Sequence, residues 1–272
     1  MSAADFPLGL RFNLPAEQYH AMPGVSASGL RDFARSPLHY FALHLDPARP
    51  APVEKAGQLE GTLAHCAILE PDQFDARYAI GPDVSRATKE WKAWEASETR
   101  QAIKPQQAAV ARAQARSVRS LPDVHALLSK GIPEVSAFWI DEATGEPCRC
   151  RPDWVHTVEG RGVILVDVKT CGDADPDEFA RQVARKGYHR QAAWYSDGYE
   201  AASGQPVLGF VFVAVEDAWP FAASAVMLDD EGLQRGREQN RELLQQFAEC
   251  RRTNVWPGYG TAITPITLPA WA

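Results

Sequence analysis

The pattern of apolar positions divides the chain into helices and strands. Apolar residues recur with helical spacing at 26–45 and 57–69, alternate with polar ones at 134–140, and form continuous runs at 163–166 and 206–215, which is typical of buried strands. In chain order the pattern predicts helices at 26–45, 57–70 and within the polar stretch 76–122, strands at 134–140, 147–155 and 162–170, a helix at 176–201, strands at 206–215 and 221–228, and a helix at 229–252. We therefore expect a mixed α/β (α+β) fold in which helices flank a central mixed sheet.

The strand at 162–170 changes character abruptly, because its apolar run is followed by Asp167, Val168 and Lys169. Side chains alternate between the faces of a strand, so the carboxylate and the ammonium share one face. Burying charge is costly unless the charge is paired or binds a metal. A hairpin would bring the carboxylate of Asp153 to the same place. Such residues could hold a divalent cation and orient a water for phosphodiester hydrolysis; a solvated hairpin with an ordinary ion pair is the alternative.

The helix at 57–69 carries a single histidine, His65, among small residues, and it stops at Pro71. A lone histidine in such a helix commonly belongs to the core or to a cap. The small neighbours would also let the helix approach the strand ends closely enough to deliver a metal ligand.

Composition sets broad limits. The 272 residues are 45% hydrophobic and 23% charged, as in an ordinary globular protein. No apolar run approaches the roughly 20 residues of a membrane span, and the N-terminus lacks a signal-peptide pattern. Five cysteines without C-x-x-C pairs favour reduced thiols over disulfides, a zinc ribbon or an iron–sulfur cluster, so we expect a cytoplasmic protein. The net charge of −7 does not favour a nucleic-acid binder, although an acidic metal site contributes to it.

Four motifs occur in the order found in one nuclease superfamily. They are G-x-x-x-H-x-x-I-L-E-P at 61–71, R-P-D at 151–153, D-V-K-T at 167–170 and Q-x-x-x-Y at 191–195. Each motif alone has limited specificity, but the ordered set resembles the PD-(D/E)xK superfamily, and within it the RecE-type (exonuclease VIII-like) and RecB-like exonuclease domains. The resemblance covers about residues 26–215 and implies the αβββαβ core of that fold.

The resemblance implies a metal site beside a catalytic lysine. The side chains of His65, Asp153 and Asp167, with the backbone carbonyl of Val168, would hold one or two Mg²⁺ or Mn²⁺ ions, and both aspartates would be catalytic. Lys169 would orient the attacking water and stabilise the negative charge that develops.

By the same resemblance, Gln191 and Tyr195 would complete the catalytic set. They lie four residues apart on one helix face, where their polar tips would line the cleft and position the substrate or the catalytic lysine. A solvated Gln191 and a core Tyr195 are the alternative.

Residues in three places, basic except for one serine, are candidates for DNA contact. They are Ser28 and Arg31, then Arg112, Arg116 and Arg119, and finally Arg185, Lys186 and Arg190. By resemblance, the early Ser/Arg pair would face the 5′-phosphate of DNA; a helix N-cap and a solvated arginine are the alternative. The second group lies at i, i+4 and i+7 on one helix face, which either a DNA backbone or solvent could neutralise.

The resemblance implies a metal-dependent exodeoxyribonuclease that digests double-stranded DNA ends 5′ to 3′ in phage-type (prophage) recombination. It also implies a homo-oligomeric ring and a single-strand annealing protein as partner. We expect one nuclease domain over 1–272, with its core at about 26–228 and a C-terminal helix and irregular tail at 229–272. The alternatives are a Cas4-like nuclease or an endonuclease of this fold, a catalytically inactive relative that binds DNA or protein, and an unrelated α/β scaffold.

Overall fold

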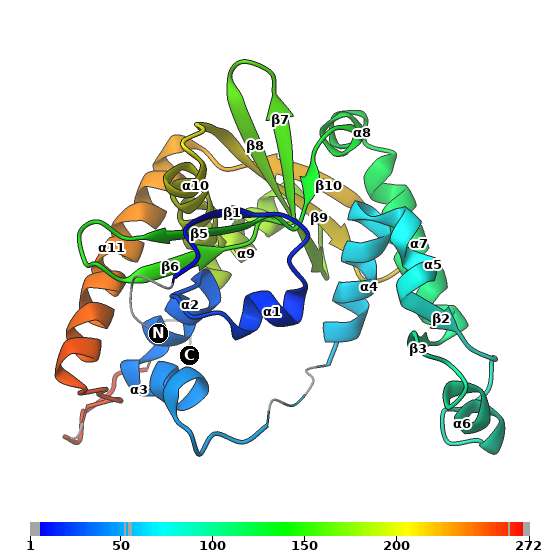
Figure 1. The fold of residues 1–272 in the computed structure, drawn as a ribbon, viewed down its shortest axis with the longest axis horizontal. Helices are drawn as coiled ribbons and strands as arrows, with labels where there is room; N and C mark the ends of the chain where they lie inside the picture. Colours follow the sequence, from blue (N-terminus) through cyan, green and yellow to red (C-terminus); the bar gives the residue numbers. More distant parts are fainter. Residues whose placement is uncertain (1–5, 52, 54–55, 261, 269–272) are drawn as a thin grey trace.

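The computed structural model describes residues 6–51, 53, 56–260 and 262–268 (Figure 1). The expected loop at 46–56 and the irregular tail therefore lie partly outside the described residues. The α-helices are α1 (Ala16–Ala21), α2 (Ala27–Arg35), α3 (Pro37–Tyr40), α4 (Gln58–Leu69), α5 (Pro71–Arg77), α6 (Lys89–Glu95), α7 (Pro105–Arg119), α8 (Pro122–Ser129), α9 (Pro176–Lys186), α10 (Tyr188–Ser203) and α11 (Asp230–Thr253). A π-helical turn at Phe41–Leu45 follows α3.

Ten strands form three sheets among the described residues. They are β1 (Gly9–Arg11), β2 (Tyr78–Ile80), β3 (Gln101–Ile103), β4 (Ile132–Pro133), β5 (Ser136–Ile140), β6 (Pro147–Cys150), β7 (Trp154–Val158), β8 (Gly162–Cys171), β9 (Val207–Glu216) and β10 (Ala223–Met227). The central sheet has the order β10-β9-β8-β7-β4, in which β8 and β9 are parallel and the other neighbours antiparallel. This mixed sheet confirms the expected fold class.

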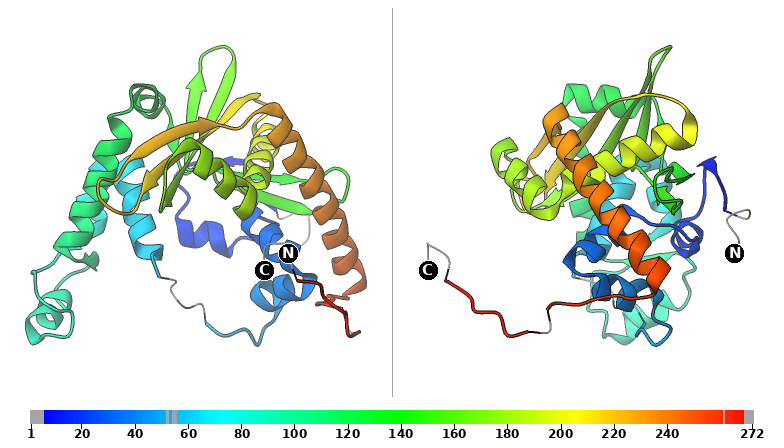
Figure 2. Two further views of the ribbon diagram at one scale, coloured as in Figure 1. Left: turned by 180° about the vertical axis from the view of Figure 1, so that it is seen from behind. Right: turned by 90° about the vertical axis from the view of Figure 1, so that its left-hand side faces the viewer.

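Helices cover both faces of the central sheet, as Figures 1 and 2 show. On one face, α4 and α7 pack against Val166, Val168 and Val213. On the other face, α9 and α10 pack against Leu165, Phe212 and their neighbours. Both β8 and β9 are therefore buried on two sides, which explains why their sequences read as continuous apolar runs. The expected alternation along β8 is confirmed: Val168 faces α4, so the side chains on either side of it face α9 and α10.

The stretch 147–155 was expected to be one strand of a hairpin, and this was wrong. It forms two strands in different sheets, because β6 pairs with β5, whereas β7 pairs with β8. The chain crosses between them at Arg151–Asp153. Pro152 has no N–H to donate to a ladder, so pairing stops there and the chain can change sheets. Asp153 thus stands at a junction of two sheets.

Two further expectations about local structure were also wrong. The helix expected at 176–201 is two helices, because Gly187 adopts a left-handed conformation (φ +69°) that ends α9 and starts α10. The stretch 76–122 is not wholly helical, since the short strands β2 and β3 pair in parallel within it. Tertiary pairing at these strands overrides the polar, helix-like local sequence.

The last helix, α11, packs along α10 and contacts α2. It crosses α10 closely at Gly236. All five cysteines are free and buried. No helix among the described residues is long and apolar enough to cross a membrane. That residues 1–272 form one domain remains a prediction.

Replacing Gly236 by alanine should lower the free energy of unfolding by about 1–3 kcal/mol. The added Cβ would clash with the carbonyl oxygen of His189 and lie 2.9 Å from the Cβ of Ala193, so α11 must move away from α10. Gly61→Ala in α4 is the matched control, because its Cβ would approach no closer than 3.9 Å to Thr170. Alanine there should be neutral or stabilising by up to about 1 kcal/mol. Urea unfolding measures both, and equal effects would refute the close crossing.

Candidate active site

The site is built on an unpaired edge of β8. Strand β7 pairs with β8 only as far as Trp154 opposite Val166, whereas β8 continues to Cys171 alongside β9. The backbone N–H of Val168 therefore has no strand partner on that edge, and it donates instead to Oδ2 of Asp153 at 2.8 Å. The N–H and C=O of one strand residue point to the same side. The carbonyl of Val168 consequently faces the same space as the Asp153 carboxylate.

Asp167, which is buried, and Lys169, which is partly buried, form an ion pair on the face of β8 that α9 and α10 cover. Oδ1 of Asp167 accepts a hydrogen bond from Nε2 of Gln191 at 2.7 Å. Oδ2 is buried and has only the Lys169 ammonium against it among the described residues. The ammonium also lies 4.9 Å from the ring centroid of Tyr188. The sequence-predicted trio of Asp167, Lys169 and Gln191 is thus brought into contact.

A cluster of three metal-ligating side chains lies beside this pair. Donor atoms of His65, Glu134 and Asp153 all lie within 4.8 Å of one another. Nδ1 of His65 is 3.4 Å from Oδ2 of Asp153, which also accepts from Val168. An imidazole and two carboxylates are a donor set suited to Mn²⁺ or Mg²⁺. The donor chemistry therefore fits a divalent cation.

Glu134 is the ligand candidate that sequence reasoning missed. It lies between β4 and β5 with a positive φ of 54°, and its N–H donates to the carbonyl of Asp153 at 3.0 Å. Its carboxylate is held by Nε of Arg151 at 2.5 Å. The only available signal was an acidic residue at the start of an apolar strand, and such residues are commonly solvated. The close approach to Asp153 depends on the contact between two sheets.

The electrostatics of the cluster favour a cation. Burial and the neighbouring Asp153 raise the pKa of Glu134 to about 7. Burial and Asp167 raise the pKa of Asp153. Burial and Lys169 lower the pKa of His65, so its imidazole is neutral and free to ligate. Burial lowers the pKa of Lys169, but the two aspartates more than offset it, so the pKa is raised and the lysine keeps its proton.

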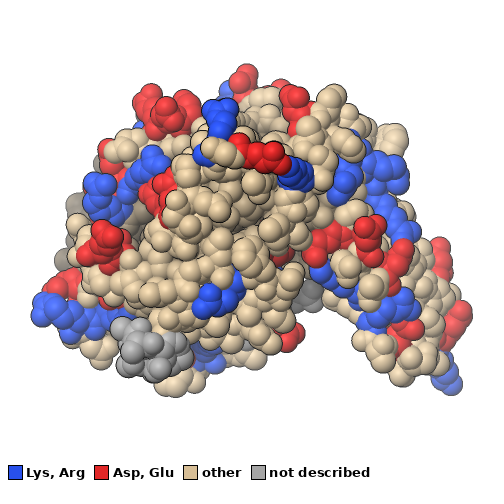
Figure 3. All heavy atoms as spheres, turned by 45° about the horizontal axis from the view of Figure 1, so that its top comes forward, with Lys and Arg blue, Asp and Glu red and all other residues tan. Residues whose placement is uncertain are grey.

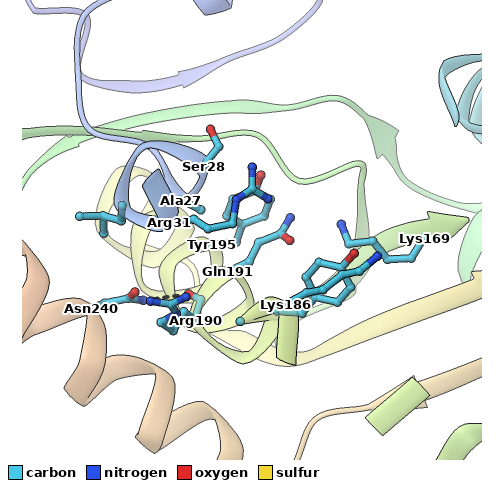
Figure 4. A pocket seen from close by; sticks show the side chains of 12 residues that line it. Ala27, Ser28, Arg31, Lys169, Lys186, Arg190, Gln191, Tyr195 and Asn240 are labelled. Atoms are coloured by element: carbon cyan, nitrogen blue, oxygen red, sulfur yellow. Dashed lines mark hydrogen bonds between the residues drawn. The ribbon is translucent and has the colours of Figure 1, made fainter. Parts of the chain in front are cut away.

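A basic cavity of about 220 Å³ opens on the other side of Lys169 (Figure 4). Figure 4 shows the side chains of Arg31, Gln191 and Lys169 converging on it from α2, α10 and β8. Ser28, Tyr195, Lys186 and Arg190 also line it, and no aspartate or glutamate does. Burial and the nearby Arg31 lower the pKa of Arg190. Lys169 is paired with Asp167, but Arg31, Lys186 and Arg190 have no ion pair among the described residues, which makes the cavity receptive to an anion.

A second cavity of about 650 Å³ adjoins the metal-ligating cluster, and it is lined by His65, Glu134 and Arg151 among others. It has no lining residue in common with the basic cavity. His65 and Glu134 thus line one cavity and Lys169 lines the other. Over the face in Figure 3, basic and acidic side chains are interspersed, so this face carries no continuous basic patch.

Four of the residues expected to contact DNA lie away from the basic cavity. Arg185 is exposed on α9 and is not part of the cavity lining. Arg112 forms an ion pair with Asp75 of α5 at 2.6 Å. Arg119 donates to the carbonyl of Ile68, at the C-terminal end of α4. The chain itself thus supplies partners for Arg112 and Arg119, and neither they nor Arg116 line either cavity of the site.

A strand-edge cluster of acids, a histidine on the preceding helix and a lysine two residues after an aspartate define the PD-(D/E)xK fold class. The chain belongs to the family described as "PDDEXK-like domain of unknown function (DUF3799)", whose model matches residues 26–266. No curated protein matches the chain.

A solved structure shows the same fold. A protein from Eubacterium rectale, described as a candidate exonuclease, matches with a TM-score of 0.65 and 15% identity over 94% of this chain and 97% of that one, and at this identity the likeness concerns the fold alone. An alkaline exonuclease (LHK-Exo) from Laribacter hongkongensis matches with a TM-score of 0.26 and 18% identity over 68% of this chain and 97% of that one, and this score is too low to show a shared fold.

The titration of Glu134 should make metal affinity rise with pH up to about pH 7. Above that pH, Glu134 should add no further pH dependence. A metal must displace the proton that Glu134 holds below its pKa of about 7, so affinity should fall by about tenfold per pH unit below that value. Calorimetric titration with Mn²⁺ in buffers of different ionisation enthalpy would measure the proton release. Glu134→Gln should weaken Mn²⁺ binding and abolish the part of the proton release that comes from Glu134. A wild-type affinity independent of pH would contradict the assignment of Glu134 as a metal ligand.

Proposed function

We propose that the protein is a metal-dependent exodeoxyribonuclease that hydrolyses phosphodiester bonds at the ends of double-stranded DNA. One observation carries the proposal: the three side chains that could hold a metal lie beside a partly buried, charged lysine, and this lysine lines a basic cavity that no acidic residue lines. Phosphodiester hydrolysis needs a cation and a proton-bearing group beside a site that binds a phosphate. Membership of the PDDEXK-like family supports the same chemistry.

His65, Glu134, Asp153 and the carbonyl of Val168 would hold one or two Mg²⁺ or Mn²⁺ ions, with Oδ2 of Asp167, which contacts the Lys169 ammonium, as a further ligand. A bound ion of this kind lowers the pKa of a water and offsets charge on the phosphoryl oxygens. The crowded carboxylates support this role, because burial and mutual repulsion raise their pKa values and a bound cation would offset both.

The remaining residues act through Lys169 and the substrate. Lys169 keeps its proton and stabilises negative charge on the phosphate, while Asp167 holds the ammonium in place. Gln191 fixes Asp167 through its hydrogen bond and faces the cavity. Burial raises the pKa of Tyr195 well above its usual value, so its hydroxyl stays protonated and serves as a donor to the substrate.

The small basic cavity supports action at an end rather than within a duplex. At about 220 Å³ it has room for a terminal phosphate group, with Ser28, Arg31, Lys186 and Arg190 as its donors. We propose that the phosphate is the 5′ one and that digestion runs 5′ to 3′, in line with the RecE-type motifs. Assembly into a ring, an annealing partner, a role in phage-type recombination and a cytoplasmic location belong to the same proposal.

The wild-type protein should remove a 5′ label from linear duplex DNA with Mg²⁺ or Mn²⁺ and not with EDTA. Lys169→Ala should slow this by at least about a hundredfold, because charge on the phosphate loses its stabilising ammonium. Lys130→Ala is the control, since Lys130 is exposed and pairs with Glu159. Nicking of closed circular DNA would instead indicate an endonuclease. Duplex binding without cleavage under any metal would indicate an inactive relative.

Arg31→Ala should abolish a preference for 5′-phosphorylated over 5′-hydroxyl duplex ends. Loss of a charge-assisted hydrogen bond is worth about 10- to 100-fold in rate on phosphorylated ends. Arg35→Ala, on the same helix but outside the cavity lining, should leave the preference intact. Digestion of the two end types in parallel measures the ratio. An unchanged ratio in Arg31→Ala would remove the terminal-phosphate role from this cavity.

A further inference from the structure

Helices α5 and α7 lie on the outer flank of the molecule (Figure 1), and they line a separate groove of about 600 Å³. It has no lining residue in common with either cavity at the candidate active site. Its accessible lining is predominantly carbon: Pro71 of α5 is exposed, and the largely buried Ala67, Phe74 and Ala115 close its floor. An apolar concavity of this kind accommodates apolar side chains of a ligand.

Arginines border this apolar floor. Arg112, Arg116 and Arg119 line the groove from one face of α7, and Asp75 is the only acid that lines it. Arg112 is paired with Asp75 and also lies 5.3 Å from the ring centroid of Phe74. Arg119 is turned inward to the carbonyl of Ile68.

Arg116 lies between these two on the helix and is exposed. No ion pair or hydrogen bond of its side chain occurs among the described residues. The groove consequently offers one available guanidinium beside apolar carbon. Like charges three or four residues apart also destabilise a helix slightly, so an acidic ligand beside Arg116 would stabilise α7 as well.

We propose that this groove binds a short segment of a partner protein in which an apolar side chain stands next to acidic residues. The apolar side chain would lie against Pro71 and the floor of the groove, and a carboxylate would pair with Arg116. A DNA backbone fits less well, because phosphates need polar partners whereas the lining is mostly carbon and two of the three arginines are already engaged. The proposal does not depend on the proposed nuclease function, since the groove is separate from that site.

The test begins with a display library of short random peptides selected on the immobilised full-length protein. Peptides that combine acidic residues with Leu, Ile or Phe should be enriched, and the best should be synthesised with a fluorescent label. Arg116→Glu should weaken their binding by at least about tenfold in fluorescence anisotropy. The substitution is at an exposed position, so the fold should persist, which circular dichroism checks. Arg161→Glu, at an exposed arginine outside the groove, should leave the affinity unchanged.

Any of four results would overturn the proposal. A library that yields no enriched peptide would do so, and so would peptides that bind wild type and Arg116→Glu with equal affinity. Weaker duplex DNA binding when Arg116→Glu is added to the Lys169→Ala protein, without any selected peptide, would replace the peptide with DNA. Self-association lost in Arg116→Glu, measured by sedimentation, would likewise replace the partner with a second copy of this chain.

Discussion

The structure depends on the cost of burying charge at the unpaired edge of β8. Asp167 is almost fully buried, and it is tolerated there because Lys169 and Gln191 neutralise and hold it. Asp153 replaces the missing strand by accepting the N–H of Val168. These contacts leave one carbonyl and several carboxylate oxygens directed at the same space, which is the arrangement a divalent cation requires.

The two faces of the central sheet supply different groups to this edge of β8. Helix α4 delivers His65 from one face of the sheet, whereas α9 and α10 supply cationic and hydrogen-bonding side chains from the other. The break at Gly187 turns the chain between these two helices, so that Lys186 and Arg190 both reach the basic cavity. The lysine side of the cluster is therefore locally basic, despite a net charge of −7 for the whole chain.

The flank formed by α5 and α7 illustrates why charge periodicity is a weak guide to partners. Three arginines on one face of α7 indicated an anionic partner. In the fold, Asp75 already pairs with Arg112, and the carbonyl of Ile68 at the end of α4 accepts a hydrogen bond from Arg119. What remains available is a single guanidinium beside apolar carbon. That combination suits a protein ligand better than a phosphate backbone.

The sequence by itself determined the elements whose signal is local. The apolar run of β8, the alternation that puts Asp167 and Lys169 on one face, and the helix that carries His65 follow from the two-residue period of a strand and the 3.6 residues per turn of a helix. The place of Gln191 in the site came from the family resemblance. Only the tertiary structure decided the rest. Pro152 moves the chain from one sheet to another, and this places Asp153 beside Glu134, which no motif indicated. Such approaches arise from packing between sheets, and packing between distant segments leaves no periodic trace in the sequence.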